Sequence, residues 1–315
     1  MTESSSSVAP RLRAGRNRTL TLSEADRSRL SAQLTAPTAP LAPDEWRNRL
    51  FHGDFFALAP LLPAGSVDLL IVDPPYNLSK DFGVVKFSRA DDAAYEEYLD
   101  GVFRALRPLL KPEASIYCCG DWGCSAAQYR VLAHHFTIRN RITWQREKGR
   151  GARHNWKNAT EDIWFATAGN HYYFNVDAVK QKRRVLAPYR ENGRPKDWTE
   201  EADGRFRLTC PGNFWDDITV PYWSMPENTD HPTQKPEKLL AKLILASLPD
   251  HGLVFDPFAG SGSTLATARK LGRDFAGVEI NPEYCLWALK RLELAAIDRR
   301  IQGYDGVFME RNSMR

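Results

Sequence analysis

The 315-residue chain lacks the residue patterns that mark metal-binding, secreted and membrane-spanning proteins. Its five cysteines contain no pair at zinc-finger spacing, and its seven histidines form no HxxxH or HExxH pattern. We therefore expect reduced thiols and no protein-bound metal. No apolar run approaches the roughly 20 residues that span a bilayer, and the N-terminus shows no signal-peptide core. These absences predict a cytoplasmic protein with no membrane partner.

Charge of one sign is also scarce. The 43 Lys and Arg residues against 39 Asp and Glu residues give a net charge of +4, which is too small to identify a polyanionic partner. Residues 1–45 are rich in Ser, Thr, Pro, Ala and Arg, a composition that favours disorder. A short helix over residues 22–34 is one alternative, and a basic arm that contacts a polyanion is another.

Short apolar runs alternate with amphipathic segments from residue 46 onward, and this alternation predicts an α/β fold. The segment 67–72 is rich in branched apolar residues, as in a parallel strand buried on both faces. It ends at Asp73, Pro74, Pro75 and Tyr76, and prolines cannot continue a sheet ladder. Ligands of α/β sheets bind at the carboxyl ends of strands, which makes Asp73 and Tyr76 candidate site residues. The simpler alternative is a stiff turn in which Asp73 acts as a cap.

A second corner follows the predicted strand 253–255. Asp256 opens a glycine-rich turn, Asp256-Pro-Phe-Ala-Gly-Ser-Gly-Ser-Thr264, and a helix is expected over residues 265–271. The next strand, 275–278, ends in Glu279, which is placed to accept hydrogen bonds from a ribose. The turn has neither the lysine of a Walker A loop nor a full GxGxxG pattern. Its backbone donors suit a carboxylate or phosphate, and Asp256 suits a cation, so S-adenosylmethionine is a candidate ligand.

Two basic stretches, residues 146–157 and 180–196, are interleaved with aromatic side chains. Cations combined with stacking rings are typical of nucleic-acid binding. The alternative is a solvated, loop-rich subdomain. The candidate DNA-binding residues are Arg150, Arg153, Lys182, Arg183 and Arg184.

Three motifs together resemble the β-class DNA amino-methyltransferases, which modify adenine N6 or cytosine N4 with S-adenosylmethionine. They are DPPY at 73–76, HPTQKP at 231–236 and DPFAGSGST at 256–264, and the resemblance covers residues 50–294. It implies a doubly wound, mostly parallel, Rossmann-like methyltransferase sheet with circularly permuted motif order. It also implies a catalytic half (46–179), a loop-rich target-recognition region (180–229), a cofactor-binding half (230–300) and a C-terminal tail (301–315).

The resemblance also assigns roles to single residues. S-adenosylmethionine would lie over the turn at Phe258, with Glu279 at the ribose and with Thr233 and Lys235 at the methionine end. The full expected cofactor set is Asp73, Thr233, Lys235, Asp256, Phe258, Ala259, Gly260, Ser261, Gly262, Glu279 and Asn281. Asp73 and the Pro74 carbonyl would accept the hydrogens of the target amine, Pro75 would stiffen the corner, and Tyr76 would stack on a flipped base.

The expected function is site-specific methylation of double-stranded DNA, with adenine N6 preferred over cytosine N4. A methyltransferase for RNA, protein glutamine or a small molecule is an alternative, although such enzymes often carry Asn where Asp73 stands. A DNA-binding module without activity is a second alternative. A cytosine-C5 enzyme is discounted because the one Cys-Pro pair, Cys210-Pro211, lies far from both corners in sequence. A cognate restriction endonuclease and a second copy of the chain are candidate partners.

Overall fold

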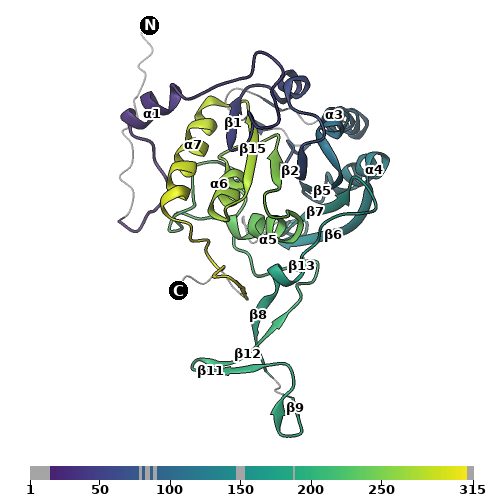
Figure 1. The fold of residues 1–315 in the computed structure, drawn as a ribbon, viewed down its shortest axis with the longest axis vertical. Coiled ribbons are helices and arrows are strands. Elements are labelled where there is room, and N and C mark those ends of the chain that lie inside the picture. The colour runs from purple at the N-terminus through teal and green to yellow at the C-terminus, as the bar shows by residue number, and fades with distance from the viewer. Residues whose placement is uncertain are drawn as a thin grey trace.

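An eight-stranded sheet forms the centre of the computed structural model, which describes residues 15–77, 80–81, 86–87, 91–146, 153–186 and 189–310 (Figure 1). The strands from β1 to β5 in the spatial order run parallel, whereas β7 is antiparallel to both neighbours. The predicted mostly parallel sheet is confirmed. In spatial order the strands are β1 (Arg49–His52), β15 (Asp274–Glu279), β14 (Leu253–Asp256), β2 (Val67–Val72), β5 (Leu110–Gly120), β7 (Thr160–Thr167), β6 (Thr137–Gln145) and β13 (Phe214–Trp215).

Helices cover both faces of this sheet, as a doubly wound fold requires (Figure 1). Strand β2 shows why: Leu70 and Val72 belong to one core, Leu69 and Ile71 to the other, and all four are at most 2% exposed. One face carries α2 (Phe55–Leu58), η1 (Ala59–Leu61), α3 (Asp92–Leu106), η2 (Arg107–Leu109) and α4 (Ser125–His135). The other carries α5 (Glu237–Ser247), α6 (Ser263–Lys270) and α7 (Pro282–Ile297).

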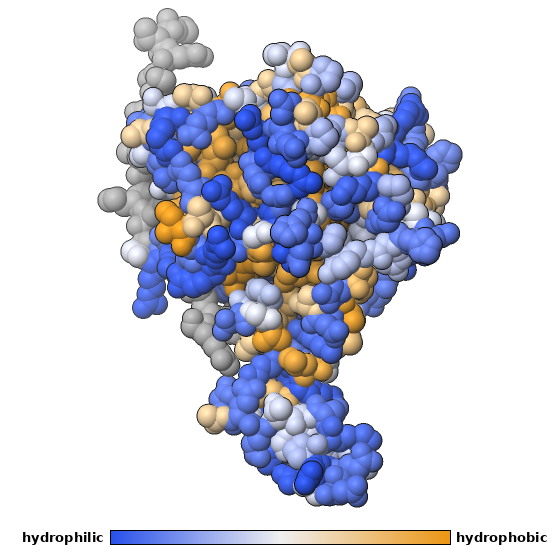
Figure 2. Space-filling model, viewed as in Figure 1, coloured by the Kyte–Doolittle hydropathy of each residue, from blue (hydrophilic) through white to orange (hydrophobic). Residues whose placement is uncertain are grey.

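A narrow β-structured arm projects from the body, and its surface is mainly hydrophilic (Figures 1 and 2). It lies in the region where the sequence predicts only a loop-rich segment. Its strands are too short and too polar to show a clear period. The arm follows η3 (Asp177–Val179) and consists of β8 (Gln181–Arg184), β9 (Arg190–Glu191), β10 (Arg194–Pro195), β11 (Thr199–Glu201) and β12 (Gly204–Thr209). The C-terminal β16 (Phe308–Met309) pairs with β8, and β3 (Lys80–Asp81) pairs separately with β4 (Lys86–Phe87).

The N-terminal segment differs from the expected disorder over residues 15–45. Helix α1 (Glu24–Ser31) has a capping box between Ser23 and Asp26, and its Leu30 is fully buried. Ion pairs join α1 to α7, among them Lys290 to Asp26 at 2.8 Å and Arg29 to Glu293. Contacts with residues more than 250 positions away therefore order a segment whose composition alone favours disorder.

Within the described part of the chain, no helix combines the length and the apolar character needed to cross a membrane.

Candidate active site

Four neighbouring strands end at one edge of the sheet, and acidic residues stand at or just beyond their ends. Asp73 follows β2, Asp256 ends β14, Glu279 ends β15, and Asp54 lies two residues beyond β1. Because the strands are parallel and in register, their carboxyl ends meet at this edge. The two corners predicted from the sequence therefore lie side by side.

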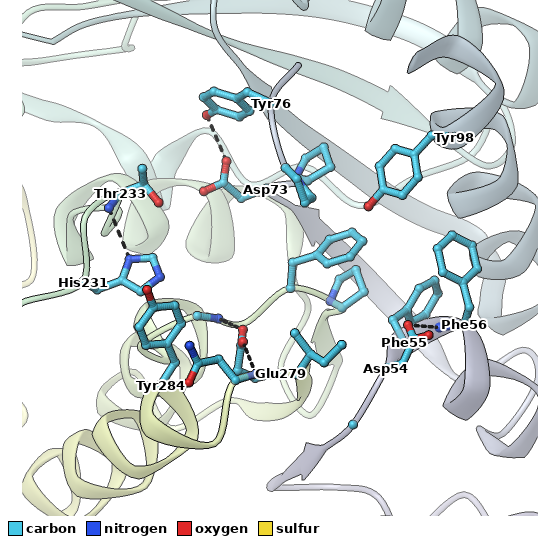
Figure 3. A pocket seen from close by; sticks show the side chains of 18 residues that line it. Asp54, Phe55, Phe56, Asp73, Tyr76, Tyr98, His231, Thr233, Glu279 and Tyr284 are labelled. Carbon is cyan, nitrogen blue, oxygen red and sulfur yellow. Dashed lines mark hydrogen bonds between the residues drawn. The ribbon is translucent and has the colours of Figure 1, made fainter. Parts of the chain in front are cut away.

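A cavity of about 300 Å³ opens between these strand ends (Figure 3). Asp73 borders it on one side and Glu279 on another, with aromatic rings between them. The lining residues are Gly53, Asp54, Phe55, Phe56, Asp73, Pro74, Pro75, Tyr76, Tyr98, His231, Thr233, Pro257, Phe258, Gly260, Glu279, Ile280, Asn281 and Tyr284.

The Asp73 corner is fixed by hydrogen bonds from three sides. The Tyr76 hydroxyl donates to Asp73 Oδ1 at 2.9 Å, and the Tyr95 hydroxyl donates to the Pro75 carbonyl at 3.2 Å. The backbone N–H of Asn77 donates to Cys124 Sγ at 3.2 Å. Burial and the Asp73 carboxylate raise the pKa of Tyr76, so its hydroxyl stays a donor. The corner is therefore built to hold one orientation of the Asp73 carboxylate.

Lys235 lies against this corner rather than in the cavity lining. Its Nζ donates to Asp73 Oδ2 at 2.6 Å and to the Tyr76 hydroxyl at 3.1 Å, and it lies 3.4 Å from Glu161 Oε2. Burial lowers the pKa of Lys235, but the carboxylates of Asp73 and Glu161 outweigh burial, and the pKa ends above its ordinary value. The ammonium is therefore charged.

The Glu279 carboxylate is held by backbone donors on both oxygens. Gly260 N–H donates to Oε2 and Asn281 N–H donates to Oε1, each at 2.7 Å. Burial raises the pKa of Glu279, and these backbone donors oppose the rise. Each carboxylate oxygen keeps a further lone pair that can accept a hydrogen bond from a ligand hydroxyl.

Two glycines of the second corner are required by close approach. A Cβ on Gly260 would lie 2.9 Å from His231 Nε2, and a Cβ on Gly262 would lie 2.5 Å from the Ala288 Cβ. Both have positive φ, +53° and +73°, which glycine adopts without strain. Gly260 thus leaves room at the cavity wall, while Gly262 lets α6 pack against α7.

Asp256 faces inward. It accepts hydrogen bonds from the Thr264 hydroxyl at 2.6 Å and from the Phe258 N–H at 3.1 Å. Burial raises the pKa of Asp256 to about 7, although both hydrogen bonds act to lower it and the nearby Asp73 and Glu279 add to the rise. It therefore occupies the capping position that the sequence left open for Asp73.

The structure brings together only part of the expected cofactor set. Asp73, Thr233, Phe258, Gly260, Glu279 and Asn281 line the cavity. Lys235, Asp256, Ala259, Ser261 and Gly262 lie behind the lining, where Ser261, for example, accepts from the Arg291 guanidinium at 3.2 Å through its carbonyl.

Sequence reasoning missed several residues around the cavity. Asp54 caps α2 by accepting from the Phe56 N–H at 3.1 Å, and it follows a strand that pairs with β15. A short apolar run that ends in Gly-Asp is the signal that could have found it. Tyr98 and Tyr284 come from α3 and α7, where an aromatic at helical spacing looks like an ordinary core residue. Glu161 lies near the start of β7, and its contact with Lys235 joins residues far apart in sequence.

The candidate DNA-binding residues fall in different places. Arg150 lies outside the described residues, and Arg153 is exposed just beyond that gap. Lys182 and Arg184 lie on β8 of the arm, both close to the Phe206 ring, at 4.4 Å and 5.8 Å from its centroid. Arg183, between them in sequence, donates to Gln181 Oε1 at 3.2 Å.

Comparisons with known proteins agree with the fold and the cavity. The family model described as DNA methylase, of the N6/N4 type, matches residues 67–290. The DNA adenine methyltransferase YhdJ of Escherichia coli (strain K12) is 36% identical over 258 residues, which is 78% of this chain and 83% of the relative. The type II methyltransferase M.HpaI of Haemophilus parainfluenzae is 30% identical over 252 residues, 78% of this chain and 73% of the relative.

Solved structures share the fold at lower identity. The cytosine-N4-specific PvuII DNA methyltransferase aligns with a TM-score of 0.58 at 18% identity, over 82% of this chain and 89% of its own. The DNA modification methylase TTHA0409 of Thermus thermophilus, complexed with S-adenosyl-L-methionine, aligns with a TM-score of 0.53 at 22% identity, over 85% and 99%.

The doubly wound sheet and its edge cavity define a Rossmann-like methyltransferase. The chain belongs to the N6-adenine/N4-cytosine DNA methylase family. It is therefore an S-adenosylmethionine-dependent enzyme that methylates an exocyclic amine of DNA, as the motifs predict.

Proposed function

We propose that this enzyme methylates the N6 amine of adenine at a fixed sequence in double-stranded DNA. The observation that carries the proposal is Asp73 at the end of β2, facing the cavity beside the Pro74 carbonyl. The relative named as an adenine methyltransferase, at 36% identity, favours adenine over cytosine.

Asp73 and Pro74 act on the amine. The lone pair of an exocyclic amine is delocalised into the ring, which makes the nitrogen a poor nucleophile. Two acceptors, the Asp73 carboxylate and the Pro74 carbonyl, would hold its two hydrogens and aim the lone pair toward the cavity. Because Tyr95 uses the neighbouring Pro75 carbonyl, the corner is fixed through a different oxygen. This is catalysis by orientation.

The residues present fit S-adenosylmethionine. The cavity combines a carboxylate fixed by two backbone N–H groups, the apolar walls of Phe258 and Ile280, and a wall at Gly260 that a Cβ would fill. Glu279 would accept from the ribose hydroxyls, while Thr233 and Asn281 would contact other polar atoms. When bound, the cofactor supplies an electrophilic methyl group on a sulfonium.

The arm and the basic stretch would hold the DNA. Phe206 beside two cations offers a stacking surface within a positive patch, a combination that suits nucleic acid. Tyr76 would face a base turned out of the duplex, which costs a few kcal/mol of lost stacking. Arg153, Lys182, Arg183 and Arg184 would contact phosphates.

The cellular context is part of the same proposal. M.HpaI and M.BglII are named as type II methyltransferases, which supports a cognate restriction endonuclease as a partner for this chain. A homodimer and a cytoplasmic location, where the DNA substrate would be found, complete the expectation.

Nucleoside analysis tests the function. Duplex DNA is incubated with the enzyme and labelled S-adenosylmethionine, digested and separated, and N6-methyladenine is expected. N4-methylcytosine instead would reassign the base, and neither product would refute the proposal. Asp73→Ala should abolish transfer while cofactor binding, measured by calorimetry, persists. Modified-base sequencing of the same DNA would give the recognition sequence.

A further inference from the structure

A buried ammonium lies at the centre of the polar contacts behind Asp73. The three oxygens within 3.4 Å of Lys235 Nζ belong to Asp73, Tyr76 and Glu161. An ammonium has three N–H donors and no acceptor, so each donor has one oxygen to face. Lys235 is only 8% exposed, so water competes little for these contacts.

Glu161 supplies the second negative charge of this cluster. It lies on β7, is 3% exposed, and its other oxygen accepts from the Arg146 guanidinium just beyond the end of β6. The charges therefore alternate from Arg146 through Glu161 and Lys235 to Asp73. A buried charge is tolerated when it is paired in this way. Glu161 thus helps to keep the ammonium charged and fixed in place.

We propose that Lys235 is a positioning residue for Asp73, which it orients and keeps ionised for the target amine, and that Glu161 holds Lys235 in place. The proposal rests on the function proposed above, in which Asp73 accepts a hydrogen of that amine. It gives Lys235 a different role from the one implied by resemblance, at the methionine end of the cofactor.

The hydrogen bonds explain how orientation is achieved. Oδ1 of Asp73 accepts from Tyr76, Oδ2 accepts from Lys235, and Lys235 also donates to the Tyr76 hydroxyl. This closed ring of contacts prevents rotation of the carboxylate. Each oxygen keeps another lone pair for the amine.

The charges explain the ionisation. Without the ammonium, Asp73 and Glu161 would share the site with no cation between them, and one carboxylate would take up a proton more readily. Other titratable groups also face Asp73: Tyr76, Cys118, Cys119 and Asp256. Burial raises the pKa of the two thiols, which leaves Lys235 as the cation beside Asp73.

The experiment compares kcat as a function of pH for the full-length enzyme and its Lys235→Met, Glu161→Gln and doubly substituted variants, on duplex DNA with saturating cofactor. Lys235→Met removes the charge at similar length. We expect its kcat to fall at least tenfold at neutral pH and the acid limb of its profile to move about one pH unit or more upward. The double variant should move that limb back toward wild type, because the like charge is gone.

Cofactor affinity separates this role from a cofactor contact. Calorimetry should give Lys235→Met and Lys235→Arg nearly wild-type Kd values for S-adenosylmethionine, and Lys235→Arg should lose kcat without moving the acid limb. An unmoved acid limb in Lys235→Met, or a loss confined to cofactor Kd in either variant, would overturn the proposal. If Lys235→Met does not fold, as judged by circular dichroism, Lys235→Arg still decides by its split between kcat and Kd. An inactive wild-type enzyme would instead refute the proposed function.

Discussion

The backbone N–H of Gly260 and the carboxylate of Glu279 are joined by a hydrogen bond of 2.7 Å that links the glycine-rich turn to the end of β15. Asn281 donates to the other Glu279 oxygen at the same distance. The acid thus fixes the turn as well as facing the cavity, and its substitution should affect both.

Glu279→Gln should weaken cofactor binding about 10- to 100-fold, because one carboxylate oxygen becomes an NH₂ group that cannot accept from a backbone N–H or from a ribose hydroxyl. Isothermal titration with S-adenosylmethionine measures the change. Glu283→Gln is the matched control, since Glu283 is an ion-pair partner of Arg27 and does not line the cavity. Equal Kd values for the two variants would contradict the role of Glu279.

Gly262→Ala should destabilise the fold more than Gly272→Ala does. Both glycines have positive φ, +73° and +68°, where alanine is strained by about 1–2 kcal/mol. Only at Gly262 would the new Cβ meet another atom, 2.5 Å from Ala288, whereas nothing lies within 4 Å at Gly272. Chemical denaturation should show an additional loss of about 1–3 kcal/mol for Gly262→Ala. Similar losses in both variants would mean that α6 and α7 move apart easily.

The two corners could be predicted from the sequence because their signals are local. An apolar strand that stops at Asp73 and two prolines, or at Asp256 and a run of glycines, reports both a strand end and its carboxyl-edge location. The contact of Lys235 with Asp73 could not be predicted in this way, since it joins residues 162 positions apart through the fold.

Other parts of the fold depend on contacts that sequence patterns do not report. The arm strands, such as β8 and β12, are four and six residues long and mostly polar, so they show no clear period. Helix α1 depends on ion pairs with α7 and on the burial of Leu30. The capping role of Asp256 was also missed, because side-chain direction at a strand end depends on the turn that follows.

The stability of the enzyme should carry a pH-dependent contribution from Asp256. Burial raises its folded-state pKa from 3.8 to about 7, so the folded state binds a proton that the unfolded state releases. The contribution is fully present below pH 4 and is lost as pH rises through about 7. Asp256→Asn should therefore flatten the dependence of the unfolding free energy on pH between about 4 and 7, measured by urea denaturation.

An exposed carboxylate provides the control for this pH effect. Asp44→Asn removes an exposed acid outside the site and should leave the slope unchanged. Glu227 contributes in the same direction, because burial and the charge of Glu237 raise its pKa to about 7, so part of the slope should remain in Asp256→Asn. A slope identical to wild type would show that Asp256 is ionised in the folded protein at neutral pH.

DNA binding by the arm should separate into charge and stacking. Replacing Lys182 and Arg184 together with Ala should weaken binding to duplex DNA and reduce the slope of log Kd against log salt by about 2, one for each lost phosphate contact. Phe206→Ala, beside these cations, should weaken binding with little change in slope, because stacking releases no counterions. Fluorescence anisotropy over a salt series measures both. Arg29→Ala, an exposed cation on α1 paired with Glu293, should change neither. If the double variant keeps the wild-type slope, the arm does not contact phosphates, and the basic segment that includes Arg153 becomes the surface to test.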